Sequence, residues 1–127
     1  MMRRLCYAAM LAAMLAFFCT FPLLSVEKHC RAMEQELSLA AAFAIQGDLE
    51  QAAPHALAAR SLWDNWQTGA NMYLRHAELD PVKAAMGEML VWLETGEAAE
   101  FYSACSRARL LVQHLSESEW ASIGNIL

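Results

Sequence analysis

Apolar residues recur every three or four positions along almost the whole chain, and no stretch alternates apolar and polar residues long enough to predict a strand. This spacing is typical of helices that bury one face. The first seam after the amino-terminal region consists of Cys30, Met33, Leu37, Ala41 and Ala44. Gly47 and Asp48 are expected to be the C-cap of this helix and the N-cap of the next. No glycine or proline lies between Pro22 and Gly47, so we expect one unbroken helix to run through this region.

A second helix is predicted from Asp48 toward Trp66, and residues 67–71 end it. Its seam is expected to comprise Leu49, Ala53, Ala56, Leu57, Arg60 and Trp63. Pro54 lies within this pattern and lacks a backbone N–H, so it is expected either to kink the helix or to delay its start to about Pro54.

A third helix is expected to open at Asp80-Pro81 and to close at Thr95-Gly96. Its seam is Val82, Met86, Met89 and Leu93. The fourth helix has the clearest pattern, formed by Phe101, Ala104, Cys105, Ala108, Leu111, Val112 and Leu115. Residues 116–118 are expected to end it, which leaves an apolar tail without a helix of its own.

The pattern of helix, Gly-acid turn and helix occurs twice, around Gly47-Asp48 and around Gly96-Glu97. We therefore predict an all-α chain whose two helical hairpins form an up-and-down bundle of about four helices. Stacked hairpins of the tetratricopeptide kind are the alternative packing. In an up-and-down bundle, residues 67–80 and the tail after Leu115 return to the end of the bundle at which the first helix enters.

The run from Leu5 to Val26 carries no charge over its 22 residues, and about 20 residues are enough to cross a bilayer as a helix. It is longer than the apolar core of a cleaved signal peptide and lacks a small-x-small cleavage site. We therefore predict a signal anchor at 1–26 and a helical-bundle domain at 27–127, in a single-pass protein of the cell membrane. The carboxyl-terminal domain is expected outside the cytoplasm, with Trp66, Tyr73 and Trp120 at the level of the membrane interface.

Charge separates these two parts of the chain. Residues 27–127 hold all 14 acidic residues and 7 of the 9 basic ones, which gives them a net charge of −7. A domain of this charge beside an anionic membrane has no electrostatic attraction for nucleic acid or for the lipid surface. These two classes of partner are therefore not expected.

The cysteines are predicted to serve packing. Cys6 and Cys19 lie in the apolar run, and Cys30 and Cys105 lie on apolar faces of the predicted bundle. Counting residues from the two turns puts Cys30 and Cys105 at heights that differ by about 10 Å, more than the ~7 Å that a disulfide allows between Cα atoms. We expect both to be buried thiols.

The cluster His76-Ala77-Glu78-Leu79-Asp80 is the main candidate for chemistry. If it is extended, His76, Glu78 and Asp80 share one side and could bind a divalent cation or respond to pH. If it begins a helix, Asp80 is the N-cap, Pro81 is the first helical residue, and no ligand is needed. The second interpretation fits the preferences of four residues. Since no nucleophile elbow, phosphate loop or paired catalytic carboxylate occurs, we expect neither an enzyme nor a cofactor.

These features resemble an uncharacterised bacterial family, filed as a domain of unknown function and numbered four-three-six-three. The resemblance rests on the amino-terminal apolar helix, the Gly-acid turn at 47–48, Trp66, the "HAELD" run, and the ending "HLSESEWASIGNIL". Pro54 and the abundance of alanine depart from the family pattern. The resemblance implies no activity, but it implies a multi-spanning membrane protein as a partner.

From the residues and the resemblance together, we expect a membrane-anchored, non-catalytic protein that interacts with another component of the envelope. The tail residues Trp120, Ile123, Asn125, Ile126 and Leu127 either cap the bundle or form its contact patch. The alternative is an extracytoplasmic cation or pH sensor that uses His76, Glu78 and Asp80.

Overall fold

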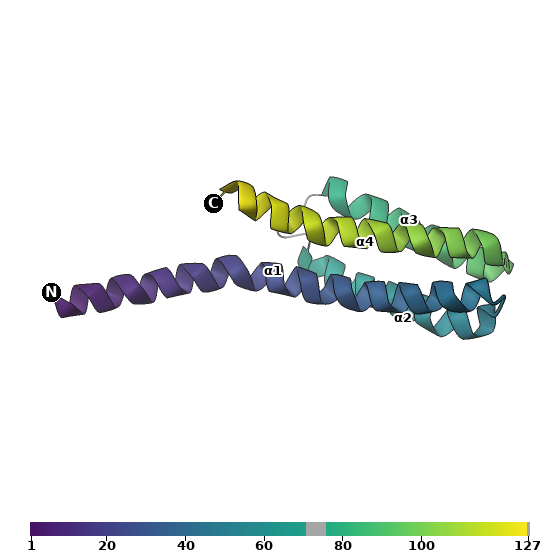
Figure 1. Cartoon of the computed structure of the whole chain (residues 1–127), viewed down its shortest axis with the longest axis horizontal. Helices are drawn as coiled ribbons and strands as arrows, with labels where there is room; N and C mark the ends of the chain where they lie inside the picture. The colour runs from purple at the N-terminus through teal and green to yellow at the C-terminus, as the bar shows by residue number, and fades with distance from the viewer. Residues whose placement is uncertain (71–75, 127) are drawn as a thin grey trace.

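Helix α1 runs without a break from Met2 to Ile45, and it joins the apolar amino-terminal segment to the rest of the molecule (Figure 1). It is followed by α2 (Leu49–Ala70), α3 (His76–Thr95) and α4 (Ala98–Ile126). This computed structural model describes the backbone of residues 1–70 and 76–126, and it describes side chains outside 20–25, 69–76 and 119–127. Every element within these ranges is a helix, which confirms the all-α class.

The helices form a bundle in which the chain runs alternately away from and back toward the apolar segment of α1 (Figure 1). α1 packs along both α2 and α4, α3 packs along α4, and α2 and α3 touch less. Contact between the first and last helices fits a bundle rather than a row of stacked hairpins. The apolar segment and the first bundle helix are one element, as the absence of glycine and proline between Pro22 and Gly47 predicted.

The two glycine turns have the same backbone geometry. Gly47 and Gly96 adopt φ values of +76° and +78°, a left-handed conformation that glycine adopts without steric cost. Backbone N–H groups of Gly47 and Asp48 donate to Ala44 and Phe43, both at 3.0 Å. Those of Gly96 and Glu97 donate to Leu93 at 3.3 Å and to Trp92 at 3.1 Å. Both turns are therefore Schellman motifs, and the repeat predicted from the Gly-acid pattern is confirmed.

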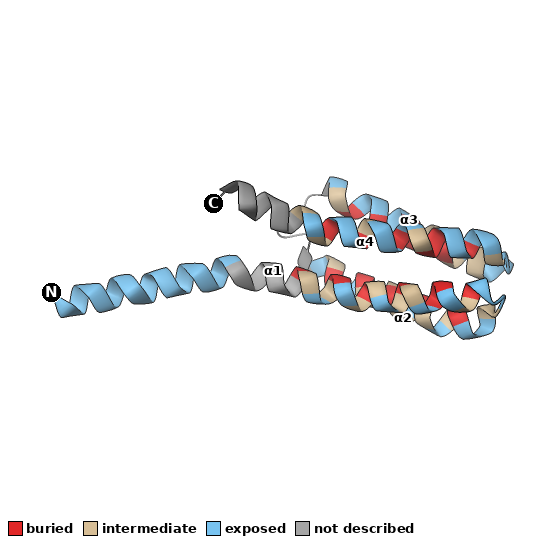
Figure 2. Cartoon of the chain, in the orientation of Figure 1, coloured by how far each residue is buried: buried red, intermediate tan, exposed pale blue. Residues whose placement is uncertain are grey.

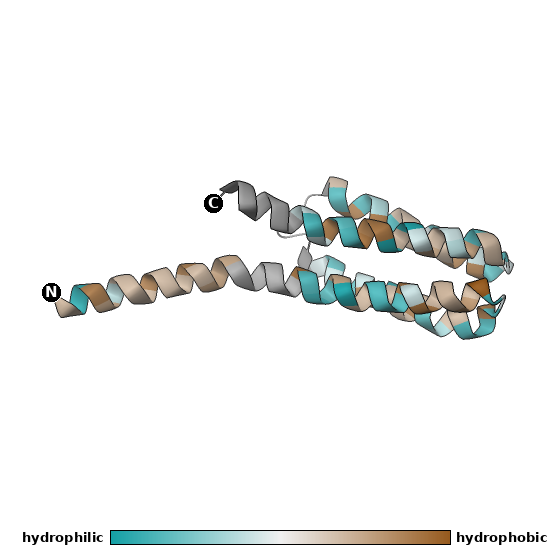
Figure 3. Ribbon diagram, viewed as in Figure 1, coloured by the Kyte–Doolittle hydropathy of each residue, from teal (hydrophilic) through white to brown (hydrophobic). Residues whose placement is uncertain are grey.

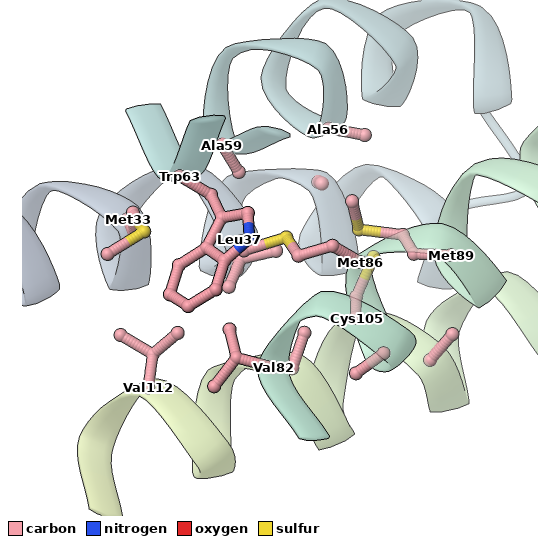
Figure 4. Close-up of a cluster of buried hydrophobic side chains, with 14 of the residues drawn as sticks. Met33, Leu37, Ala56, Ala59, Trp63, Val82, Met86, Met89, Cys105 and Val112 are labelled. Carbon is pink, nitrogen blue, oxygen red and sulfur yellow. The ribbon is translucent and has the colours of Figure 1, made fainter. Parts of the chain in front are cut away.

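Side chains from all four helices meet in one apolar core, part of which is drawn in Figure 4. Trp63 from α2 and Phe101 from α4 are the largest residues with no exposed surface. Met86 and Met89 of α3 are buried in the same core, as the predicted seam of the third helix requires, and Figure 4 shows Met86 next to Trp63. The buried face of α2 is formed by Ala52, Ala56, Ala59, Trp63 and Trp66. The predicted seam of α2 is therefore wrong at Leu57, whose side chain is mostly exposed.

Of two predicted helix boundaries, the Asp48 cap at the start of α2 is confirmed and the end of α4 is wrong. α2 begins at Leu49, so Pro54 does not delay its start. The carboxylate of Asp48 instead accepts a hydrogen bond from the backbone N–H of Gln51 at 3.1 Å, which caps the helix ahead of the proline. α4 continues past residues 116–118 to Ile126, because serine and glutamate do not by themselves stop a helix.

The apolar part of α1 stands apart from the bundle (Figures 2 and 3). Met2–Cys19 is long and apolar enough to cross a membrane by length and composition, and none of it is buried in the molecule. Val26, which the sequence assigned to the membrane segment, is 1% exposed and belongs to the core of the bundle. Below, the near end of the bundle is the end that α1 enters, and the far end is the one that carries the two glycine turns.

Candidate functional site

The cluster at 76–80 is helical, which overturns both interpretations of its backbone. α3 begins at His76, so Asp80 is not its N-cap, and Pro81 lies inside the helix. At about 100° per residue, Glu78 points away from the side that positions 76 and 80 share. Leu79 explains why the helix begins before Asp80. Its side chain is 1% exposed and continues the buried seam of Val82 at helical spacing. The side chain of His76 lies outside the described residues.

Glu78 has a different neighbour from the ones predicted. A cleft of about 230 Å³ opens between the start of α3 and the last described side chains of α4. Its lining residues are Ala77, Glu78, Pro81, Leu111, His114, Leu115 and Ser118. The fold thus brings Glu78 to a cleft shared with His114, whereas Asp80 is exposed and does not line it. Of the three predicted ligands, Glu78 and Asp80 therefore lie on different sides of α3, and the side chain of His76 is outside the described residues.

A second cleft at the near end lies between α1 and α4 and has a volume of about 180 Å³. It is lined by Glu27, Cys30, Arg31, Glu34, Gln113, Ser116 and Glu117. Arg31 donates to Glu27 at 2.8 Å, and Arg109 donates to the hydroxyl of Ser38 at 3.3 Å. Burial raises the pKa of Glu34 above the ordinary 4.5, the charges of Arg109 and Arg31 oppose this, and Glu117 adds to it. The bond from Arg109 to Ser38 connects α4 to α1, whereas the Arg31–Glu27 pair lies within α1.

His55 joins α2 to α1. Its Nδ1 lies 2.7 Å from a carboxylate oxygen of Glu36, and its ring stacks on Phe43 with the ring centroids 5.6 Å apart. The side chains of His55 and Glu36 are each about 30% exposed, so the helix interface partly shields their hydrogen bond from solvent. His55 therefore serves as a contact between α2 and α1.

Two cysteines and two tryptophans of the bundle are buried in the core: Cys30, Cys105, Trp63 and Trp66. Cys30 and Cys105 are buried thiols, as predicted, and burial raises the pKa of Cys105 to about 12. A thiol of this pKa stays protonated at neutral pH, which suits packing rather than nucleophilic chemistry. Trp66, predicted at the membrane interface, is only 5% exposed and packs 5.7 Å from Trp63 between ring centroids. The prediction for Trp66 is therefore wrong.

The predicted contact patch in the tail lies outside the described side chains. Trp120, Ile123, Asn125 and Ile126 fall on the last turns of α4, and Leu127 follows them. The backbone of the first four therefore belongs to a helix and not to an irregular tail, and Leu127 lies outside the described residues. Whether these side chains cover the bundle or contact another molecule stays a prediction.

A cleft of about 220 Å³ between α3 and α4 lies toward the far end and was missed in the sequence. It is lined by Glu88, Trp92, Ala99, Glu100, Ser103 and Arg107. Trp92 is half-buried, because it also packs against the core, and Arg107 forms an ion pair with Glu88. The sequence did contain a signal for this cleft. Glu88 and Trp92 are four residues apart, so they share one side of a helix, and the sequence that follows is mainly acidic.

These clefts offer pairs of polar groups beside apolar side chains. Among the side chains that the structure describes, no three histidine, cysteine or carboxylate groups are placed to hold a metal ion. A carboxylate next to one aromatic or basic side chain is an arrangement suited to contact with charged or polar partners.

A comparison with known protein families gives a match over most of the chain. A family described as "Domain of unknown function (DUF4363)" matches residues 20–126, which begin where the candidate membrane span of Met2–Cys19 ends and cover the entire bundle. No curated protein and no solved structure matches the chain.

Proposed function

Since the chain belongs to the DUF4363 family of domains of unknown function, we propose from its structure that it is a non-catalytic accessory protein of the cell envelope. In this proposal the apolar part of α1 anchors the protein in the cell membrane as a single span. The bundle lies outside the cytoplasm and binds another envelope protein, for which a multi-spanning membrane protein is the favoured class.

The observation that carries the proposal is the continuity of α1. Its Met2–Cys19 segment is 18 residues long, which is about 27 Å at 1.5 Å per residue and close to the ~30 Å hydrocarbon core of a bilayer. No part of this segment is buried against the bundle, so an apolar surface needs another environment. The same helix then supplies Val26 and Met33 to the core without a flexible linker.

A helix shared by membrane and bundle would fix the height and tilt of the bundle above the membrane. An enzyme or a diffusing ligand carrier has no evident need for such a connection, whereas a protein that docks on a membrane neighbour does. The bundle also exposes separate large apolar side chains, among them Leu57, Val91 and Leu110. These are accessible positions from which contact with a partner can be probed.

Anchoring is tested by extracting isolated membranes at alkaline pH. We expect the full chain to stay with the membranes and a Leu11→Arg, Leu15→Arg variant to be released, because charges at the centre of a span are costly. The matched control is Leu57→Arg, Leu110→Arg, which adds the same charge to the bundle and should stay bound. Equal release of both double variants, or of the unaltered chain, contradicts the anchor.

Partner binding is tested by placing a photoreactive amino acid at one exposed bundle position at a time in native membranes. We expect one adduct of constant mass at a subset of positions among Leu57, Val91, Tyr102 and Leu110, and none without illumination. If no position yields an adduct while the chain remains in the membrane, the accessory role is wrong and the anchor stands.

A further inference from the structure

The negative charge of the bundle is concentrated at its far end. Residues 40–53 and 88–107 surround the two glycine turns and hold six acidic residues and one basic residue, a net charge of −5. The whole of 27–127 has a net charge of −7, so all its other segments together contribute only −2. The two turns lie side by side at this end (Figure 1), so these charges act together on an approaching molecule.

The α3–α4 cleft lined by Glu88, Trp92, Ala99, Glu100, Ser103 and Arg107 lies in this region, and we refer to it as the far cleft. Trp92 is half-buried there, with part of its surface against the core and part toward the cleft. Glu100 lines the cleft without an ion-pair partner among the side chains described. The cleft therefore combines an aromatic surface with an uncompensated carboxylate.

We infer that the far cleft receives the side chain of an arginine or lysine from a segment of the partner protein. A cation placed against an indole ring is attracted by the ring electrons, and a neighbouring carboxylate pairs with it. The surrounding net charge of −5 favours the approach of a basic segment and disfavours an anionic one. This inference rests on the proposed accessory role and adds the chemistry of the partner.

Arg107 is an example of a guanidinium that already lies in the far cleft. Its Nη1 donates to the carboxylate of Glu88, which lies one helical turn before Trp92. An incoming arginine would use Glu100 and Trp92 and leave this ion pair intact. Removal of Arg107 exposes a second carboxylate, so a basic partner should then bind more tightly.

The test uses the full chain in uncharged detergent micelles and a fluorescein-labelled hexa-arginine peptide, whose anisotropy reports binding. We expect saturable binding, and we expect its affinity to fall as the salt concentration is raised from about 50 to about 300 mM, because salt screens exposed charges. Trp92→Leu and Glu100→Gln should each weaken the binding about threefold or more, the effect of a partly exposed cation–π or ion-pair contact. Glu100 is exposed, so its variant tests the cleft even if Trp92→Leu disturbs folding.

Matched controls separate the far cleft from general electrostatics. Glu50→Gln removes the same charge at the same end but outside the cleft, and it should change the affinity less than Glu100→Gln does. Arg107→Gln should strengthen binding more than Arg60→Gln, which frees Asp64 on α2 instead.

If Glu50→Gln and Glu100→Gln weaken binding equally, or if the peptide does not bind, the far cleft is not a basic-residue site. A membrane adduct from Leu57 or Leu110 in that case leaves the accessory role standing, so the two failures are distinguishable.

Discussion

The α1–α2 and α3–α4 hairpins reverse the chain with the same backbone geometry, but they present different chemistry on either side of the turn. Each has a glycine at φ near +77° and the same pair of Schellman hydrogen bonds. In the first hairpin Asp48 caps the following helix through the N–H of Gln51. In the second, Glu97 makes no such side-chain bond among the contacts described. The first hairpin carries the apolar segment, and the second carries the far cleft.

This difference shows that a hairpin's turn and its function are specified by separate residues. The turn needs a residue that adopts a positive φ without steric cost, and both hairpins have a glycine there. The faces of the helices are free to differ, so the buried face of α2 is built from alanine and tryptophan, whereas that of α3 includes methionine. In the proposed function, the same folding unit supplies an anchor in one half and a surface for a partner in the other.

The largest expected effect tests whether both hairpins contribute equally to the core. Trp63→Ala in the first and Phe101→Ala in the second each remove a fully buried aromatic side chain. Each should lower the free energy of unfolding by about 3–5 kcal/mol, from lost burial and the remaining cavity. Urea unfolding of the full chain in detergent, followed by circular dichroism, measures this.

Leu57→Ala is the control for these two variants, because Leu57 is 55% exposed on the same helix as Trp63. Its substitution should change the free energy of unfolding by no more than about 0.5 kcal/mol. A cost for Trp63→Ala as small as that of Leu57→Ala would mean that the first hairpin does not share the core.

The equality of the two turns is tested by Gly47→Ala and Gly96→Ala. No atom lies within 4 Å of a Cβ added at either position, so only backbone strain at positive φ opposes the substitution. Each variant should lose about 1–2 kcal/mol of unfolding free energy, the cost of a left-handed conformation for an L-residue. Unequal losses in urea unfolding would show that the turns differ in strain despite their common geometry.

Gly87→Ala gives a control of opposite sign. Gly87 lies inside α3, also has no atom within 4 Å of an added Cβ, and does not have a positive φ. Alanine is the better helix former, so this variant should gain roughly 0.5–1 kcal/mol. A loss at Gly87 would indicate that the space around α3 is smaller than described.

The turns and most seams were predictable because they depend on local sequence. Gly47, Gly96 and the Val82–Met86–Met89 spacing determine structure within a few residues of themselves. The start of α3 was not predicted, because Asp80-Pro81 resembles a helix start more closely than His76 does. Burial of Leu79 on the common seam outweighs that capping preference, and its spacing from Val82 was the signal to use.

Contacts between helices could not be read from the sequence, because they depend on how far each helix slides along its neighbour. Nothing in the sequence places Glu36 against His55 or Arg107 against Glu88. The same reason explains Trp66, which looked suited to an interface but turns its indole toward Trp63. Of the candidate site, Glu78 was correctly placed at the near end, but its neighbour His114 requires the packing of α3 on α4.

A smaller difference between the hairpins is the cap itself. Asp48→Ala removes the hydrogen bond to the N–H of Gln51 and should cost about 1 kcal/mol of unfolding free energy. Glu97 is the equivalent residue of the second turn, and Glu97→Ala should change the free energy of unfolding by no more than about 0.5 kcal/mol. Asp48→Ser, which keeps a capping oxygen, should recover most of the loss. Equal costs at Asp48 and Glu97 in urea unfolding would contradict the difference.

The smallest effect concerns Glu34, at the junction of the two hairpins where α1 faces α4. Burial raises the pKa of its carboxyl above 4.5 in the folded chain, with Arg109 and Arg31 opposing and Glu117 reinforcing the rise. The folded state therefore holds more protons than the unfolded state as pH rises from 4.5 through the folded pKa, so stability falls across that window. Glu34→Gln removes this loss and should make the protein slightly more stable at pH 7.

The measurement is the urea midpoint of both proteins at pH 7 and again below the ordinary glutamate pKa of 4.5, where their difference should disappear. Arg109→Gln, made in the chain that keeps Glu34, should further lower the free energy of unfolding at pH 7. It removes the arginine that has the larger opposing effect on the pKa of Glu34. If Glu34→Gln instead destabilises the protein at pH 7, the attraction of Arg109 and Arg31 outweighs burial. Ion pairing then adds to the apolar packing of α1 on α4, as the exposed pair of Arg107 and Glu88 adds to that of α3 on α4.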